Sequence, residues 1–184
     1  MKKDKYNLLL DAAIEVLTEK GFEKTSISHI VKEAGVAHGT FYLYFDSKSA
    51  IVPAIAERIL NELVEQLDLQ DGLPIEDLIT KLVVSSFEMT KRYRKVITLC
   101  YSGMAFYHSL ERWEEIYRPY YEKIALQLEQ NQSLTLPAPA FQTARMIVNT
   151  IENAAEMYHV AYQQENTEQQ SQQHVTQFIL NAIN

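Results

Sequence analysis

Residues 25–48 read TSISHIVKEAGVAHGTFYLYFDSK, which is two short helical patterns separated by a glycine. Thr25 and Ser26 offer side-chain oxygens that can cap a first helix, whose apolar face would include Ile30. Gly35 would supply the positive φ angle with which the chain reverses before a second helix begins. The spacing of these elements predicts a helix-turn-helix.

The second helix of this pattern has an apolar face and an unusual outer face. Phe41 and Phe45 lie four residues apart, so we expect both rings to face the core. The residues predicted to point away from the core, or to lie at its edge, are His38, Gly39, Thr40, Tyr42 and Leu43. An outer face with an aromatic ring and no fixed charge suits a helix that enters the major groove of DNA. By spacing alone, a helical hairpin with an incidental glycine fits equally well.

The same stretch resembles the DNA-binding signature of TetR-type transcriptional regulators. The resemblance extends from Tyr6 to Ile51 and rests on the Thr-Ser pair, the Ala-Gly-Val turn, the Gly-Thr pair and the Tyr-x-Tyr-Phe block with its following Lys. It implies a homodimer that binds double-stranded DNA. The phosphate contacts that it implies are made by Thr25, Ser26, Tyr42 and Lys48. The candidates for base contacts are His38, Gly39, Thr40 and Leu43; because His38 stands where the family varies, no operator sequence is implied.

The composition of the chain excludes several other classes of protein. Of its 184 residues, 47% are apolar and 22% are charged, which is typical of a globular protein. The single cysteine cannot form an internal disulfide, and no Cys/His cluster has the spacing of a zinc site. The N-terminus has no apolar signal region, and no run of residues is apolar enough for a membrane span. We therefore expect a cytoplasmic protein without a metal or cofactor.

The formal net charge of −7 is unevenly distributed along the chain. Residues 1–50 hold seven lysines and seven acidic residues, so the excess negative charge lies entirely in residues 51–184. A local phosphate-binding face in the first fifty residues is therefore compatible with the acidic total.

Apolar residues recur at intervals of three and four along nearly the whole chain, which predicts an all-α fold of about nine helices. The N-terminal helix of the chain would end at Gly21, before the two helices of the motif. A fourth helix would begin near Ser47. Pro53 would then lie beyond its first turn and kink it. Further helices are predicted at 75–91, 94–107, 109–131, 138–163 and 167–183. We expect a DNA-binding head at 1–46 and a larger domain for effector binding and dimerisation at 47–184.

The helix predicted at 138–163 is apolar on more than one face, which indicates burial on both sides. One face would meet the core of its own chain, and another would join the last helix in an interface of four helices with a second subunit. The candidate interface residues are Val148, Ala155, Tyr158, Tyr162, Val175, Phe178 and Ile179. The alternative is that a single chain covers both faces.

The larger domain is rich in aromatic and thioether side chains, and the family resemblance implies a pocket for a small-molecule effector there. The candidate pocket residues are Phe87, Tyr101, Met104, Tyr107, Trp113, Tyr117, Tyr121, Asn149 and Glu152. For each aromatic residue, core packing is the alternative. The polar residues Asn149, Glu152 and Asn153 would either orient a ligand or form hydrogen bonds across the dimer interface.

Enzymatic motifs are absent from the sequence. It contains no Gly-rich phosphate loop, no paired-His metal motif and no nucleophile elbow, so we predict no catalytic residues. The basic run at 91–95 is interpreted as a solvated junction between helices, with a second nucleic-acid patch as the alternative. The predicted function is a DNA-binding repressor that a small molecule releases from a palindromic operator. The alternatives are an activator, or a ligand-binding or protein-interaction module that no longer binds DNA.

Overall fold

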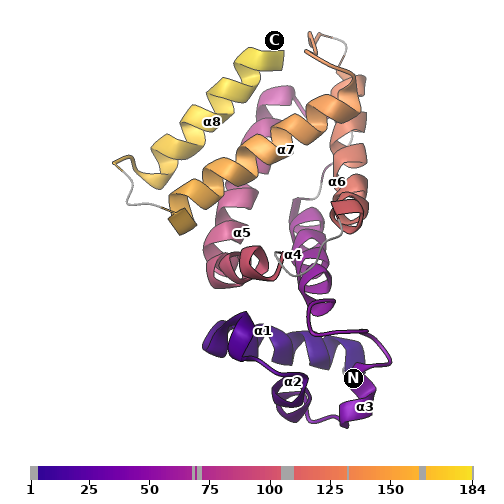
Figure 1. Ribbon diagram of the computed structural model, residues 1–184. Coiled ribbons are helices and arrows are strands. Elements are labelled where there is room, and N and C mark those ends of the chain that lie inside the picture. Colours follow the sequence, from indigo (N-terminus) through magenta and orange to yellow (C-terminus); the bar gives the residue numbers. More distant parts are fainter. Residues whose placement is uncertain are drawn as a thin grey trace. The chain divides into compact units, whose positions relative to one another are not determined.

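The computed structural model describes residues 4–67, 69, 72–104, 110–131, 133–161 and 165–183, with the backbone alone at 99–104 and 110. The elements in this part of the chain are α1 (Lys5–Lys24), α2 (Ile27–Glu33), α3 (His38–Phe41), α4 (Ile51–Leu67), α5 (Ile75–Met104), α6 (Leu110–Gln130), α7 (Ala140–Glu156), the π-helix η1 (Met157–Ala161) and α8 (Glu168–Ile183) (Figure 1). The prediction of an all-α fold is confirmed. None of the described helices is long and apolar enough to cross a membrane.

The helices form two compact units. The N-terminal unit comprises Met1–Ile59 and Lys95–Trp113, and the C-terminal unit comprises Leu60–Arg94 and Glu114–Asn184. Helices α4, α5 and α6 therefore each contribute residues to both units. The division at residue 46 proposed from the sequence concerns domains of function, and it stays a prediction.

The core of the N-terminal unit is built from one face of each of its first helices. The buried side chains of α1, α2 and the α3 segment include Leu9, Leu10, Ala13, Val16, Leu17, Ile30, Val31, Phe41 and Phe45. Gly21 has the predicted positive φ, 79°, and interrupts the helical conformation, but α1 is assigned as far as Lys24, three residues beyond the predicted end. The expectation that Phe41 and Phe45 face inward is confirmed, since both rings are buried.

The turn between α2 and α3 follows the predicted geometry. Gly35 has a φ of 66°, which an L-residue with a side chain rarely adopts. Its neighbour Val36 donates a backbone hydrogen bond of 3.0 Å to the carbonyl of Val31, and this bond fixes the exit from α2. The two helices and the tight turn between them form the helix-turn-helix seen in Figure 1.

Helix α4 begins at Ile51, four residues later than predicted. Ser47 instead opens a turn, in which its Oγ accepts a hydrogen bond of 3.3 Å from the backbone N–H of Ala50. Pro53 is thus the third residue of the helix. The first four N–H groups of a helix have no intrahelical partner, so a proline there removes no helical hydrogen bond. The physical reason for predicting a kink at Pro53 therefore does not apply.

Helix α5 runs without a break from Ile75 to Met104, so the prediction of two helices with a junction at 91–95 is wrong. Two of the basic side chains of this run pair with acidic residues of other helices. Lys91 Nζ lies 3.0 Å from Glu168 Oε2 of α8, and Arg92 Nη1 lies 2.5 Å from Glu62 Oε1 of α4. These contacts explain why a charged run continues a helix instead of ending one.

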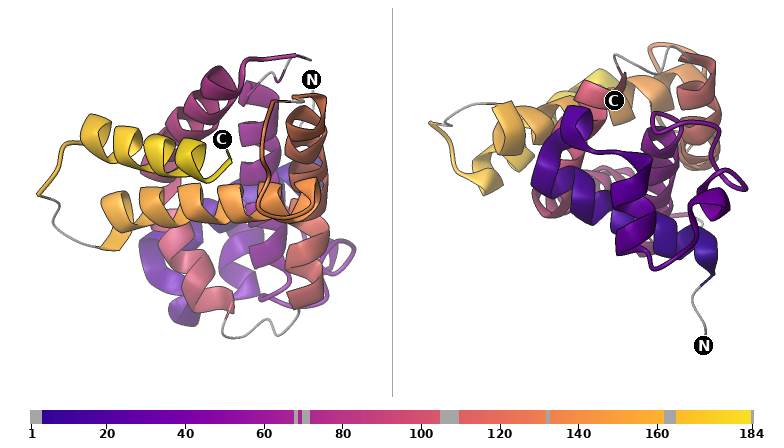
Figure 2. Two further views of the ribbon diagram at one scale, coloured as in Figure 1. Left: turned by 90° about the horizontal axis from the view of Figure 1, so that it is seen from above. Right: turned by 60° about the horizontal axis from the view of Figure 1, so that its bottom comes forward.

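The last two helices of the C-terminal unit lie side by side (Figures 1 and 2). Their buried faces include Ala144, Ile147, Val148, Ile151, Ala155, Val175, Ile179, Leu180 and Ile183. The α-helical form of α7 ends at Glu156, and a π-helical segment follows, where a single helix to residue 163 was predicted. An apolar pattern carries no signal that separates a π turn from an α turn.

Candidate nucleic-acid interface and ligand site

Helix α3 combines a fixed inner side with a free outer side. Phe41 is completely buried, whereas Tyr42 is 52% exposed and Leu43 is 77% exposed. His38 is also exposed, and its ring lies 5.7 Å from the ring of Tyr42, measured between centroids. The outer side of α3 and of the turn at 42–44 that follows it therefore presents an imidazole, a phenol and an isobutyl group to solvent. Those groups suit contacts with base edges, thymine methyl groups and phosphates.

The first helix of the motif is held by a reciprocal cap. Ser26 Oγ accepts a hydrogen bond of 3.3 Å from the N–H of His29, and His29 Nδ1 accepts one of 3.3 Å from the N–H of Ser26. In this capping box a histidine takes the place that Glu or Gln usually occupies. No role was predicted for His29 from the sequence, although the Ser-x-x-His spacing of residues 26–29 is a signal for this cap. The Ser26 hydroxyl hydrogen is not used in the cap and can be donated to a phosphate.

Two of the predicted phosphate contacts also hold the unit together. Lys48 Nζ donates to the carbonyls of Phe22 (2.6 Å) and Thr25 (2.8 Å), and it lies 4.3 Å from the centroid of the Phe22 ring. Thr25 is buried, and its Oγ1 donates to the carbonyl of Gly21 at 2.7 Å. Lys48 thus ties the end of α1 to the chain beyond α3. An ammonium group has three N–H donors, so one remains for a phosphate.

Gly39 and Thr40, two of the candidates for base contacts, differ in their surroundings. Thr40 is buried, while Gly39 is exposed. A Cβ atom added at Gly39 would have no atom of the chain within 4 Å, and its φ lies outside the left-handed region. The folded chain itself therefore does not require a glycine at this position. Close approach of another molecule to this backbone is the functional reason that a glycine can have here.

The C-terminal unit brings four of the ligand-site candidates together. The rings of Tyr117 and Tyr121 lie 5.7 Å apart, and Tyr121 Oη donates a long hydrogen bond of 3.5 Å to Asn149 Oδ1. Glu152, one turn further along α7, accepts a hydrogen bond from the Tyr117 hydroxyl. Tyr120 joins the same group, and its hydroxyl bonds to the buried Ser86 of α5.

The other ligand-site candidates lie elsewhere. Phe87 is fully buried against Tyr158 and His159, with ring centroids 6.1 and 5.9 Å away. Trp113 belongs to the N-terminal unit, and its indole Nε1 has no hydrogen-bond partner in the described part of the chain. Tyr107 lies outside the described residues, and so do the side chains of Tyr101 and Met104.

Burial is the largest cause of the pKa shifts of Glu152 and the tyrosines around it. It raises the pKa of the Glu152 carboxyl to about 8, and the nearby Glu156 acts in the same direction, while the hydrogen bond from Tyr117 opposes both. Burial and the Glu152 charge together raise the pKa of Tyr121 to about 12 and that of Tyr117 well above its usual value. Glu152 is half-buried as a whole residue, so it is the carboxyl end of its side chain that is enclosed.

The candidate interface residues divide by burial. Val148, Ala155, Val175 and Ile179 are already buried within one chain, and Tyr158 is half-buried. Phe178 of α8 is 65% exposed, and Met146 of α7, which the candidate set did not include, is 47% exposed. Tyr162 lies outside the described residues.

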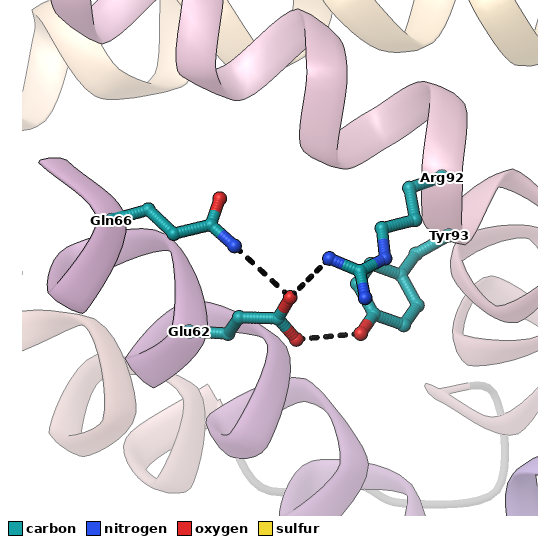
Figure 3. A network of polar contacts seen from close by, with 4 residues as sticks. All are labelled: Glu62, Gln66, Arg92 and Tyr93. Atoms are coloured by element: carbon teal, nitrogen blue, oxygen red, sulfur yellow. Dashed lines mark hydrogen bonds and ion pairs between the residues drawn. The ribbon is translucent and has the colours of Figure 1, made fainter.

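Helix α4 is anchored by charged contacts in both units. In the N-terminal unit, Arg58 lies 2.6 Å from Asp11 of α1, and Glu57 lies 2.8 Å from Arg112 of α6. In the C-terminal unit, Glu62 accepts hydrogen bonds from Gln66, Arg92 and the Tyr93 hydroxyl (Figure 3). A shift of α4 would therefore either break these contacts or move the residues that make them.

Comparison with known proteins identifies relatives of both parts of the chain. The model of the tetR family of bacterial regulatory proteins matches residues 9–55, and that of the tetracyclin repressor-like C-terminal domain matches residues 79–183. An uncharacterized HTH-type transcriptional regulator of Bacillus subtilis, YvdT, is 45% identical over 166 residues. The alignment covers 88% of this chain and 86% of the relative.

Solved structures share the fold at lower sequence identity. The transcriptional regulator FadR from Bacillus subtilis, in complex with stearoyl-CoA, superposes with a TM-score of 0.72 at 21% identity, covering 97% of this chain and 100% of FadR. A protein from Saccharomonospora viridis in complex with choline superposes with a TM-score of 0.68 at 17% identity, covering 97% and 96% of the two chains. At these identities the likeness concerns the fold alone.

Proposed function

Because the chain belongs to the TetR family of bacterial regulatory proteins and is a DNA-binding transcriptional regulator, we propose that it is a homodimeric repressor released from its operator by a small molecule. The observation that carries this proposal is the outer side of α3. Tyr42 and Leu43 are exposed on a segment whose inner side is anchored by Phe41. In the cytoplasm such a segment is ready to enter a major groove without rearrangement.

The contacts with DNA divide into two kinds. Ser26, Tyr42 and the third N–H of Lys48 hold phosphates, which fixes the position of the motif without reading sequence. His38 and Leu43 read base edges, by a hydrogen bond to a purine and by contact with a thymine methyl group. Thr25 supports the phosphate contacts indirectly, since its hydroxyl is used within the unit.

Dimerisation uses the exposed sides of α7 and α8. Met146 and Phe178 are large apolar side chains with high exposure on two neighbouring helices. Two copies that pair through these helices form a four-helix interface and bury both side chains. The twofold axis then places two α3 helices on successive half-sites, which are about 34–36 Å apart in B-DNA.

Release follows from a difference in affinity. An effector that binds the C-terminal unit better in a conformation with badly spaced α3 helices lowers the affinity for DNA by that difference. Helix α4 is the element best suited to carry the change, since Asp11, Arg112 and Arg92 attach it along its length. Proteins of this fold bind ligands as different as stearoyl-CoA and choline, so the ligand class has to be sought in this chain's own residues.

The experiment that tests the proposal is the selection of bound sequences from random duplex DNA with the full-length protein. We expect a palindromic consensus, retention on DNA at low salt and loss at high salt. In a repeat with His38→Ala, the consensus should change while affinity for random DNA stays nearly the same. If no duplex is retained at low salt, the protein is instead a ligand-binding or protein-interaction module of this fold.

A further inference from the structure

We propose that the effector carries a positively charged ammonium group, which Glu152 binds among the rings of Tyr117, Tyr120 and Tyr121, an inference that rests on the proposed function for the role of this ligand. These four residues, with Ser86 and Asn149, are called the Glu152 cluster below. They come from α5, α6 and α7 of the C-terminal unit.

The cluster places one acidic group near three tyrosine side chains. The Tyr117 hydroxyl donates to Glu152, the Tyr117 and Tyr121 rings lie 5.7 Å apart, and the Tyr120 hydroxyl is held by Ser86. The face of an aromatic ring attracts a cation, most strongly where water is excluded. A carboxylate beside several such rings is therefore complementary to an ammonium group with apolar substituents.

The acidic group of the cluster has no paired cation among the described residues. In the described part of the chain, no lysine or arginine forms an ion pair with Glu152. It accepts a hydrogen bond from Tyr117 and interacts electrostatically with Glu156, Tyr120 and Tyr121. The nearest basic side chain of α7, Arg145, lies 3.3 Å from Glu114 instead. A carboxyl group that is enclosed without a cation costs free energy in its charged form, and a bound cation removes that cost.

The cluster extends from the surface into the interior. Asn149 is exposed, Glu152 and Tyr117 are half-buried, and Tyr120 and Tyr121 are buried. A ligand that enters beside Asn149 can place its charged group against Glu152 and its apolar part against the tyrosine rings. An anionic group would be repelled by the charged form of Glu152, so the same arrangement disfavours acidic ligands.

The titratable groups that act on Glu152 are the three tyrosines of α6 and Glu156 of α7, and α5 contributes Ser86, which does not titrate. The charges of Arg145 and Glu114 act on the neighbouring Tyr121. With a pKa of about 8, Glu152 is mostly protonated at pH 7 and mostly ionised at pH 9. A cation binds the ionised form, so its affinity should rise about tenfold between these two pH values.

The test uses choline and its uncharged isostere 3,3-dimethylbutan-1-ol as probes, with binding to the full-length protein measured by calorimetry. We expect choline to bind at least tenfold more tightly than the alcohol, with an affinity that rises from pH 7 to pH 9. Glu152→Gln should weaken choline at least tenfold, remove the pH dependence and leave the alcohol unchanged. Glu88→Gln, which removes an exposed acid from α5, should change neither probe.

Several results would overturn the proposal. These are equal binding of the two probes, no binding of either, or a choline affinity that is unchanged in Glu152→Gln. Binding of stearoyl-CoA that choline does not displace would equally assign the ligand site to another class. If Glu152→Gln does not fold, the pH profile of the wild-type protein decides alone. Selection on random DNA is independent of these measurements, so failure of DNA binding and failure of cation binding are distinguishable.

Discussion

A methyl group added at Gly39 would touch nothing in the folded chain, which separates the needs of folding from those of DNA binding at one residue. Alanine favours a helix over glycine by about 1 kcal/mol, so Gly39→Ala should leave the free energy of unfolding unchanged or raise it by up to about that amount. If DNA approaches the backbone of α3 closely, the same variant should bind every duplex at least tenfold more weakly. Denaturant unfolding and DNA titration measure the two effects.

Ser28→Ala is a suitable control for Gly39→Ala, because it changes one exposed side chain of α2 without adding bulk. A Gly39→Ala protein that binds DNA as tightly as the wild type would show that the glycine is incidental. The outer side of α3 would then have to be read through His38, Tyr42 and Leu43 without close contact to its backbone.

Glu152 makes stability depend on pH in an unusual direction for an acid. Its pKa in the folded chain, about 8, lies above the ordinary value of 4.5, so folding favours the protonated form. The stabilisation is complete below pH 4.5 and is lost as the pH rises through 8. Each pH unit in that interval is worth about 1.4 kcal/mol, so the loss between pH 5 and pH 9 is on the order of 4 kcal/mol.

The comparison with Glu152→Gln isolates this effect, because the amide cannot ionise. We expect denaturant unfolding at pH 5, 7 and 9 to show that the free energy of unfolding of the variant rises relative to that of the wild type as the pH rises. At pH 9 the variant should be the more stable of the two proteins. Parallel pH profiles for the two proteins would show that the carboxyl group is well solvated. The enclosed environment assigned to it here would then be incorrect.

At the scale of elements, Lys48 joins two parts of the helix-turn-helix unit that are distant in sequence. Lys48→Ala leaves the carbonyls of Phe22 and Thr25 without their donor. Hydrogen bonds to charged groups contribute about 1.5–3 kcal/mol, so the free energy of unfolding should fall by about that amount. The salt dependence of DNA binding should also become shallower by about one phosphate contact, provided that the third N–H reaches DNA.

Lys32→Ala is the control variant, because Lys32 is exposed on α2. Its substitution should leave the free energy of unfolding unchanged. If Lys48→Ala loses stability but keeps the salt dependence of the wild type, Lys48 is structural and does not contact phosphate. A loss of affinity with no loss of stability would assign it to DNA alone.

Local signals made the helix-turn-helix predictable from the sequence. Gly21 and Gly35 need positive φ angles, Ser26 caps the helix that follows it, and the spacing of Phe41 and Phe45 shows which side is buried. Each of these depends on neighbours within a few residues. The sequence therefore places the motif and its outer side correctly.

Contacts between distant segments account for what the sequence did not reveal. The charged run at 91–95 continues α5 because Glu62 and Glu168 meet it from α4 and α8, and no local pattern announces those partners. Glu152 was recognised as a polar residue on an apolar helix, but its tyrosine neighbours belong to α6. The start of α4 at Ile51 depends on a turn at Ser47 that competes with a helix of the same composition.

At the scale of the whole molecule, the distribution of charge concerns binding to DNA, and the exposed apolar side chains concern binding to a second copy of the chain. The excess negative charge lies in residues 51–184, so net charge opposes the approach of DNA to that part and not to the part that carries the reading helix. The large apolar side chains Met146 and Phe178 belong to the acidic part, where contact with DNA is disfavoured. This separation favours a second copy of the chain as the partner of α7 and α8.

Phe178→Glu tests that assignment in the intact protein. A charge at the centre of an apolar interface is left without a partner, so the dimer should dissociate at concentrations where the wild type stays paired. Sedimentation equilibrium measures the change. Operator affinity should fall with it, because a monomer holds one half-site only. Gln173→Glu adds the same charge to a different face of α8 and should leave the dimer intact. A Phe178→Glu protein that still sediments as a dimer would move the interface away from this face.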